Sequence, residues 1–242
     1  MKAKHKESKF SVAIKRIELK EKNRLTSLKF IIREIGILRR LSRHQSNHFS
    51  VRLLDVVIPE EEELESGKLS CVFLVMDYYE HSLKQLISAE VCNFSEDHLI
   101  VLVYNLLCSI NYLHSANVIH RDLKPSNILV TPECTVRICD FGLARTLDMT
   151  NSKRRETSPV AVSRWYRPPE IILCSDYDSK ADAWSLGCIV AELASKMCSG
   201  SKGKSKAEVL FKGNSCYPIS PCSFSEIEPK FKTAFKEIHQ KD

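Results

Sequence analysis

The residues best suited to chemistry lie near the middle of the chain, in the sequence HRDLKPSN at residues 120–127 and in the DFG that begins at Asp140. Asn127 directly precedes a short strand-like stretch, residues 128–130, and Asp140 directly follows another, residues 135–139. If these stretches pair as a hairpin, Asn127 and Asp140 meet at its open end. An amide oxygen and a carboxylate placed there form an oxygen site suited to Mg²⁺ that carries nucleotide phosphates.

Two charged residues just upstream of Asn127 extend this chemistry. Asp122 supplies a second carboxylate that is free to accept a proton, and Lys124 can place positive charge beside a transferring phosphoryl group. Phosphoryl transfer needs a metal ion, a positioned acceptor and positive charge over the developing oxygens. Each residue alone would more often be a solvated surface charge, but the combination at this spacing favours phosphoryl transfer.

These motifs resemble, nearly residue for residue, the catalytic-loop and metal-binding signatures of the eukaryotic protein kinase family. The resemblance covers about residues 11–198. It implies that Asp122 is the catalytic base for the substrate hydroxyl and that Lys124 steadies the γ-phosphate of ATP. It also implies that Asn127 and Asp140 hold Mg²⁺.

The resemblance extends upstream to residues that would bind the nucleotide. Lys15 ends the tetrapeptide VAIK and matches the strand lysine that pairs with the phosphates, and Glu34 matches the helix glutamate that orients it. Residues 71–86 resemble the strand and hinge that bind adenine through backbone groups. The nucleotide-pocket residues implied there are Met76, Asp77 and Tyr79. Cys139 would border the same pocket, either as packing or as a reactive thiol.

Residues 164–170, RWYRPPE, resemble the end of the activation segment in mitogen-activated and cyclin-dependent kinases. Arg164 and Arg167 resemble arginines linked to a preference for proline after the phosphoacceptor, which implies protein substrates with Ser-Pro or Thr-Pro. Glu170 is implied to pair with a buried arginine, but no convincing partner is visible downstream. Asp182 resembles the helix aspartate that holds the catalytic loop, and a helix-capping role competes with that assignment.

Two departures from the family pattern keep alternatives open. The Thr-x-Tyr switch of mitogen-activated kinases is replaced by Ser158-Pro159. Thr157 or Ser158 could be phosphorylated there, by an upstream kinase or by the chain itself, and the phosphate could pair with Arg121. An unmodified turn is the alternative. Residues 1–14 contain no glycine, so the family's glycine-rich phosphate loop is missing. The chain is therefore an active kinase, a kinase-like scaffold that docks partners without turnover, or a piece of a longer product.

Hydrophobic periodicity predicts the elements that must position these residues. Residues 11–17, 52–58 and 71–76 read as strands, and residues 27–41, 95–114 and a segment from Ser179 read as helices. We expect an α+β, two-lobed kinase-like fold that is incomplete at both ends. The predicted parts are a basic N-terminal extension (1–10), a partial N-lobe and hinge (11–79), a C-lobe with catalytic loop and activation segment (80–198) and an irregular, low-complexity tail (199–242).

Composition sets the remaining expectations. The net charge of +6 is modest and its lysines lack interleaved aromatics, so no nucleic-acid partner is expected. The ten cysteines include no C-x-x-C pair, which favours reduced, buried thiols over zinc or disulfides. No apolar run approaches the roughly 18 residues of a membrane helix. We expect a monomeric protein of the cytoplasm or nucleus, with ATP and Mg²⁺ as cofactors.

Overall fold

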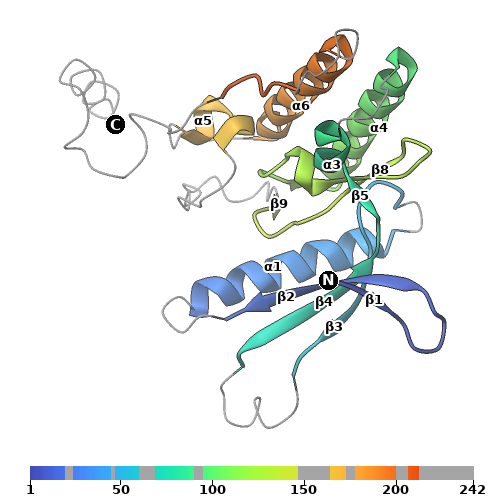
Figure 1. The fold of residues 1–242 in the computed structure, drawn as a ribbon. Helices are drawn as coiled ribbons and strands as arrows, with labels where there is room; N and C mark the ends of the chain where they lie inside the picture. Colours follow the sequence, from blue (N-terminus) through green and yellow to red (C-terminus); the bar gives the residue numbers. More distant parts are fainter. Residues whose placement is uncertain are drawn as a thin grey trace, which may run out of the picture.

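The computed structural model describes residues 1–19, 24–44, 47–59, 69–89, 95–146, 164–172, 178–199 and 207–212. Figure 1 shows a twisted sheet with one long helix formed by the N-terminal residues, and a mainly helical part formed by later residues. This arrangement confirms the predicted α+β fold class. None of the described helices is long and apolar enough to span a bilayer.

The N-terminal sheet has four antiparallel strands in the order β1-β2-β4-β3. The strands are β1 (Lys2–Lys4), β2 (Ser11–Glu18), β3 (Leu53–Val57) and β4 (Cys71–Asp77). Helix α1 (Arg24–Ser42) runs beside the sheet (Figure 1) and buries Ile31, Leu38 and Leu41. The predicted strands and helix are therefore present, with α1 beginning before the predicted Ser27.

Strand β1 lies within residues 1–10, which the sequence predicted only as a basic N-terminal extension. Lys2 pairs with Ala13 and Lys4 pairs with Ser11, so this segment is the outer strand of a hairpin with β2. The hairpin closes where Lys9 N donates to His5 O at 3.0 Å and Lys9 takes a positive φ of 59°. Lysine is common on edge strands because its charge discourages pairing with a further strand, but solvated tails are also rich in lysine. The lysines of residues 1–10 therefore did not distinguish a strand from a tail.

The helical part is built around α4 (Glu96–Ser115) and α6 (Lys180–Ser199). Ser95, where the predicted 95–114 helix begins, caps α4, since its side chain accepts a hydrogen bond from His98 N at 3.2 Å. The two long helices pack against each other, and Leu102, Leu106, Ile189 and Leu193 are buried. The shorter elements are α3 (Leu83–Ser88), α5 (Pro169–Ile172) and the 3₁₀ turns η2 (Pro125–Asn127) and η3 (Arg164–Tyr166).

Two small sheets support the segment with the chemical residues. Strands β5 (His81–Ser82), β7 (Ile128–Val130) and β8 (Val136–Ile138) form one, and β6 (Val118–Ile119) with β9 (Arg145–Thr146) forms the other. Residues before β3 join the two parts of the molecule: Val51 N donates to Ile138 O at 3.0 Å, and Ile138 N donates to Phe49 O at 2.9 Å. The sheet and the helical part therefore share a continuous core.

Candidate active site

The hairpin predicted from residues 128–139 is present. Ile128 pairs with Ile138 in β7 and β8, and Cys139 N donates to Asn127 O at 3.0 Å. These bonds fix the two chain segments side by side where the hairpin opens, so Asn127 and Asp140 lie at the same end. Strand pairing thus brings together the two residues that the sequence predicted would meet.

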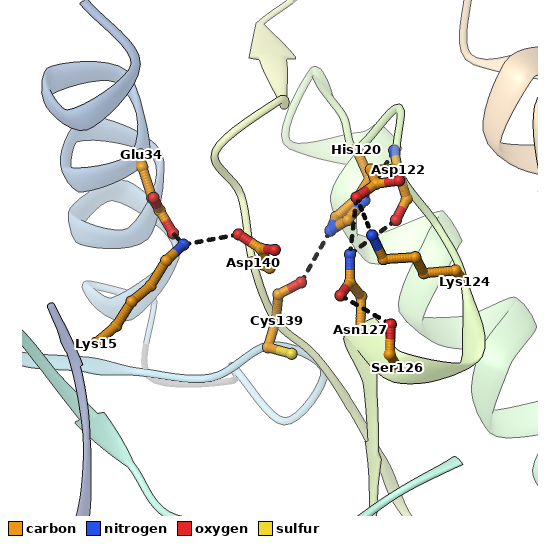
Figure 2. A network of polar contacts seen from close by, with 9 residues as sticks. All are labelled: Lys15, Glu34, His120, Asp122, Lys124, Ser126, Asn127, Cys139 and Asp140. Carbon is orange, nitrogen blue, oxygen red and sulfur yellow. Dashed lines mark hydrogen bonds and ion pairs between the residues drawn. The ribbon is translucent and has the colours of Figure 1, made fainter. Parts of the chain in front are cut away.

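Asp122 lies within hydrogen-bond distance of both of its predicted neighbours. Asn127 Nδ2 donates to Asp122 O at 2.9 Å and to Asp122 Oδ2 at 3.2 Å, and Lys124 Nζ donates to the same Oδ2 at 2.7 Å (Figure 2). Asp122 is only 7% exposed. Its Oδ1 receives no hydrogen bond from the described residues, so one carboxylate oxygen is held in place while the other can accept a proton.

The ring of His120 joins this loop to the DFG segment. Its side chain is fully buried, its Nε2 lies 3.0 Å from Cys139 O, and its ring contacts the Phe141 ring edge-on at a centroid distance of 5.2 Å. On the other side of the ring, Asp122 N donates to His120 Nδ1 at 3.3 Å. The histidine therefore fixes the spacing between the Asp122 loop and the segment that carries Asp140.

Asp182 of α6 holds the backbone of the loop that carries Asp122. Its fully buried carboxylate accepts hydrogen bonds from His120 N and Arg121 N, both at 2.8 Å, and lies 2.9 Å from His114 Nε2. Arg121 takes a positive φ of 69°, a conformation that non-glycine residues adopt only when their surroundings enforce it. Asp182 thus reaches the catalytic loop, and the contact with His114 had no signal in the sequence.

Lys15 connects the N-terminal sheet to the site. Its Nζ lies 2.6 Å from Glu34 Oε1 on α1 and 2.7 Å from Asp140 Oδ1 (Figure 2). Burial acts to lower the pKa of Lys15, but the two carboxylates outweigh it and the pKa is raised. Burial likewise acts to raise the pKa of Asp140, but Lys15 outweighs it and the pKa is lowered. Lys15 and Asp140 therefore both carry charge at neutral pH.

Glu34 is the most enclosed member of this group, with a side chain that is 3% exposed. Burial raises the pKa of Glu34 because the carboxylate has lost its water, and Lys15 only partly opposes this. Lys15 is therefore oriented by Glu34, a carboxylate whose charged form is disfavoured by burial.

The oxygen donors at the hairpin end fit Mg²⁺. Asp140 shares Oδ1 with Lys15, while its Oδ2 has no hydrogen bond or ion pair to a described residue. Asn127 turns its amide nitrogen toward Asp122, and its Oδ1 has one weak contact, Ser126 Oγ at 3.5 Å. No group of three or more acidic, histidine or cysteine side chains in the described ranges could hold a metal by itself. Mg²⁺ is usually held by one or two protein oxygens together with substrate phosphates, so this donor set suits it.

The hinge residues implied by the resemblance lie at the end of β4. Asp77 N donates to Arg52 O at 3.2 Å, and the Asp77 carboxylate accepts from Arg52 Nε at 2.9 Å and Nη2 at 3.1 Å. Asp77 is therefore engaged within the sheet. Met76 and Tyr79 are partly buried against the core, and their contact with adenine stays a prediction.

The environment of Cys139, which borders the site, makes its thiol unreactive. Burial is the main cause that raises the pKa of Cys139 to about 12, and the neighbouring Asp140 carboxylate adds to it. A thiol with this pKa carries almost no thiolate at neutral pH. Of the two roles left open by the sequence, packing is the one that the structure favours.

The activation-segment predictions fall mostly outside the described residues. Thr157 and Ser158 lie outside them, and for Arg164 only the backbone is described, in η3. Arg167 is half-buried. The structure therefore brings together Lys15, Glu34, Asp122, Lys124, Asn127 and Asp140, and it does not test the phosphorylation site or its pairing with Arg121.

Comparison with known proteins agrees with this geometry. The protein kinase domain family matches residues 1–240, so the chain belongs to that family. The mitogen-activated protein kinase homolog NTF3 of Nicotiana tabacum is 40% identical over 190 residues, which are 78% of this chain and 48% of that protein. Mitogen-activated protein kinase 2 of Arabidopsis thaliana is 41% identical over 190 residues, covering 78% of this chain and 47% of the relative.

A third relative, mitogen-activated protein kinase 4 of Oryza sativa subsp. japonica, is 41% identical over 183 residues. That match covers 75% of this chain and 46% of the relative. The chain therefore spans about half the length of the curated relatives it matches. Its similarity to mitogen-activated protein kinases confirms the resemblance seen in the sequence.

Proposed function

We propose that this chain is the catalytic part of a serine/threonine protein kinase, which transfers the γ-phosphate of ATP to serine or threonine in proteins. The observation that supports this most is the convergence of Asp122, Asn127 and Asp140 at one end of the β7–β8 hairpin. Lys15 reaches the same place from the opposite part of the molecule. A structural domain has no chemical need for this set of charged and amide groups in contact.

Asp122 is the proposed general base. Its Oδ2 is fixed by Lys124 and Asn127, which leaves Oδ1 to take the proton of the substrate hydroxyl. As that proton leaves, the hydroxyl oxygen forms a bond to the γ-phosphorus and the bond to the bridging oxygen of ADP breaks. Lys124, 2.7 Å from the base, places a positive charge where the transferring oxygens gain negative charge.

The nucleotide would lie between the sheet and the hairpin. Lys15, oriented by Glu34, would bind its phosphates, and the resemblance places adenine near Met76, Asp77 and Tyr79. Asn127 and Asp140 would hold Mg²⁺, which when bound neutralises charge on the phosphate oxygens. The contact of Asp140 with Lys15 supports this proposal, because it holds a cation beside the carboxylate that would bind Mg²⁺.

We further propose which protein acceptors the kinase prefers and where it is itself phosphorylated. Arg164 and Arg167 would favour substrates in which proline follows the serine or threonine. Thr157 or Ser158 would be the site at which an upstream kinase acts, with Arg121 as partner of the phosphate. A monomer acting in the cytoplasm or nucleus, without nucleic-acid or membrane partners, is the corresponding cellular proposal.

A kinase-like scaffold without turnover is the second candidate. The observation that favours it is that β1, which pairs with β2, and the turn that joins the two strands contain no glycine. A turn without glycine would offer fewer close backbone amides to the phosphates. The two candidates differ in whether ATP is consumed.

A peptide assay separates the two candidates. The purified chain with Mg-ATP should phosphorylate a Ser-Pro peptide, and it should phosphorylate a matched Ser-Ala peptide more slowly. Asp122→Asn should lower the rate by about 10²- to 10⁴-fold and leave ATP binding intact, because only proton transfer is lost. ATP binding without detectable transfer by the wild-type chain would support the scaffold, and equal rates for wild type and Asp122→Asn would remove Asp122 as the base.

A further inference from the structure

Arg137 has contacts that the proposed mechanism leaves unused. It lies in β8, three residues before Asp140, and it is half-buried. Its Cζ lies 5.9 Å from the centroid of the Tyr79 ring, so the guanidinium sits over that ring. Its Nη1 donates to His48 O and, at 3.1 Å, to Val136 O. One side chain therefore contacts both the hinge and the segment before β3.

Tyr79 lies where the chain leaves the N-terminal sheet. Strand β4 ends at Asp77 and β5 begins at His81, so residues 78–80 connect the two parts of the molecule without belonging to a described strand (Figure 1). Asp77 still pairs with β2. Strand pairing does not set the position of Tyr79, which therefore depends on contacts of its side chain such as the one with Arg137.

The backbone around Arg137 is fixed relative to the metal-binding end of the hairpin. Arg137 pairs with Leu129 of β7, and the next residue, Ile138, forms hydrogen bonds through its amide and its carbonyl with the segment before β3. The three residues from Arg137 to Asp140 correspond to about 10 Å of extended chain. The Arg137 side chain thus links the adenine end of the proposed nucleotide site to the Mg²⁺ end.

We propose that Arg137 is a positioning residue for the nucleotide. It holds Tyr79 at a set distance from Asp140, so that adenine and the triphosphate meet their binding residues together. The proposal rests on the ATP binding that belongs to the proposed function, and it adds a residue that acts through Tyr79. Loss of the contact should weaken Mg-ATP binding and leave KM for the acceptor peptide unchanged, because the contacts of Asp122 and Lys124 do not involve Arg137.

Tyr78 offers a matched comparison. Lys2 Nζ lies 4.4 Å from the centroid of the Tyr78 ring, so this neighbouring tyrosine also has a cation over its face. Lys2 belongs to β1, in the same sheet as β4, and so it does not connect the hinge to β8. A general effect of positive charge on the hinge would make the two cations equivalent. The proposal instead gives only Arg137, of these two, a role in nucleotide binding.

The test compares Arg137→Gln with Lys2→Gln by calorimetric titration with Mg-ATP. Glutamine can still donate to His48 O but carries no charge, so Arg137→Gln removes the cation from the ring and retains a hydrogen-bond donor. We expect Arg137→Gln to raise Kd for Mg-ATP about threefold to tenfold, as for the loss of one cation over an aromatic ring, with KM for the Ser-Pro peptide unchanged. Lys2→Gln should stay within about twofold of wild type. An unchanged Kd for Arg137→Gln, an equal rise for Lys2→Gln, or an equal rise in peptide KM would overturn the proposal.

Two further variants show whether Arg137 acts through Tyr79. Arg137→Lys restores a cation that can reach the ring and should return Kd to within about twofold of wild type. Tyr79→Leu removes the ring but keeps the hydrogen bonds of Arg137, so it should weaken Mg-ATP binding and remains a test if Arg137→Gln does not fold. In the Tyr79→Leu background, Arg137→Gln should cause no further loss. No recovery in Arg137→Lys, wild-type affinity in Tyr79→Leu, or the same loss from Arg137→Gln in both backgrounds would each contradict the proposal.

Hydrogen exchange helps to separate this proposal from the proposed function. Backbone amides of residues 78–80 should exchange faster in Arg137→Gln than in Lys2→Gln, whether or not the chain transfers phosphate. If wild type binds Mg-ATP without phosphorylating the peptide, and Arg137→Gln weakens that binding, the proposed function fails and the role of Arg137 stands. If the chain is active and neither Kd nor exchange distinguishes the two variants, the role of Arg137 fails alone.

Discussion

The two sides of the candidate active site are held in opposite ways. The Asp122 loop is fixed from the core, because the fully buried Asp182 carboxylate accepts hydrogen bonds from two of its backbone amides. On the nucleotide side Lys15 contacts the buried Glu34, but its ion pair with Asp140 is partly exposed, with side chains that are 33% and 44% exposed. Ion pairs near water contribute about 0–1 kcal/mol, whereas buried polar groups are costly to leave unpaired.

This contrast suits the roles proposed for the two sides. A base such as Asp122 must already be in place when the acceptor arrives, and buried bonds to the backbone achieve this without any ligand. In their proposed roles, Lys15 and Asp140 would exchange part of their mutual contact for phosphate oxygens and Mg²⁺. Partial exposure keeps the free-energy cost of that exchange low, so the same ion pair could open for a nucleotide.

The largest expected effect is on the buried side. Asp182→Ala leaves the amides of His120 and Arg121 and the ring of His114 without their acceptor, and we expect it to lower the free energy of unfolding by about 3 kcal/mol or more. Urea unfolding measures this. Asp97→Ala, an exposed aspartate on α4, is the control and should change the same free energy by about 0.5 kcal/mol or less. Equal effects of the two substitutions would mean that the core does not hold the loop.

A smaller effect is expected on the exposed side, and it depends on pH. The pKa of Asp140 is lower in the folded chain than its ordinary value of 3.8, so the contact with Lys15 stabilises the fold above that ordinary value. The contribution is lost as the pH falls through the lowered pKa. The melting temperature of wild type should therefore exceed that of Asp140→Asn at neutral pH, and the difference should shrink below about pH 4.

A gap between the two melting curves that grows on acidification would contradict this assignment. Because the Asp140 side chain is 44% exposed, the gap at neutral pH should be small compared with the effect of Asp182→Ala. If the two effects were similar in size, the contrast between the buried and exposed sides would disappear.

The sequence correctly predicted those elements and residue positions that depend only on residues close together in the chain. Alternating residues predicted β2, three- and four-residue spacing predicted α1, a long apolar run predicted α4, and short strands on either side of a turn predicted the β7–β8 hairpin. The positions of Asn127 and Asp140 at the strand ends follow directly from that hairpin. Local spacing was therefore enough to place the residues at the hairpin end.

Contacts between distant segments could not be obtained in the same way. The bond from Tyr166 to Glu192 and the contact of His114 with Asp182 depend on how α4, α6 and η3 pack, which no periodicity encodes. Strand β1 was missed because a lysine-rich segment also describes a solvated tail. The engagement of Asp77 by Arg52 likewise appears only once β3 lies beside β4.

The account depends most on the oxygen site at the hairpin end, and calorimetric titration with ATP tests it directly. Wild type should bind ATP more tightly with Mg²⁺ than with EDTA, and Asp140→Ala should lose most of the gain that Mg²⁺ provides, while Asp97→Ala should keep it. ATP binding that is the same with Mg²⁺, with EDTA and in Asp140→Ala would contradict the account, because Asp140 would then hold no metal beside the phosphates.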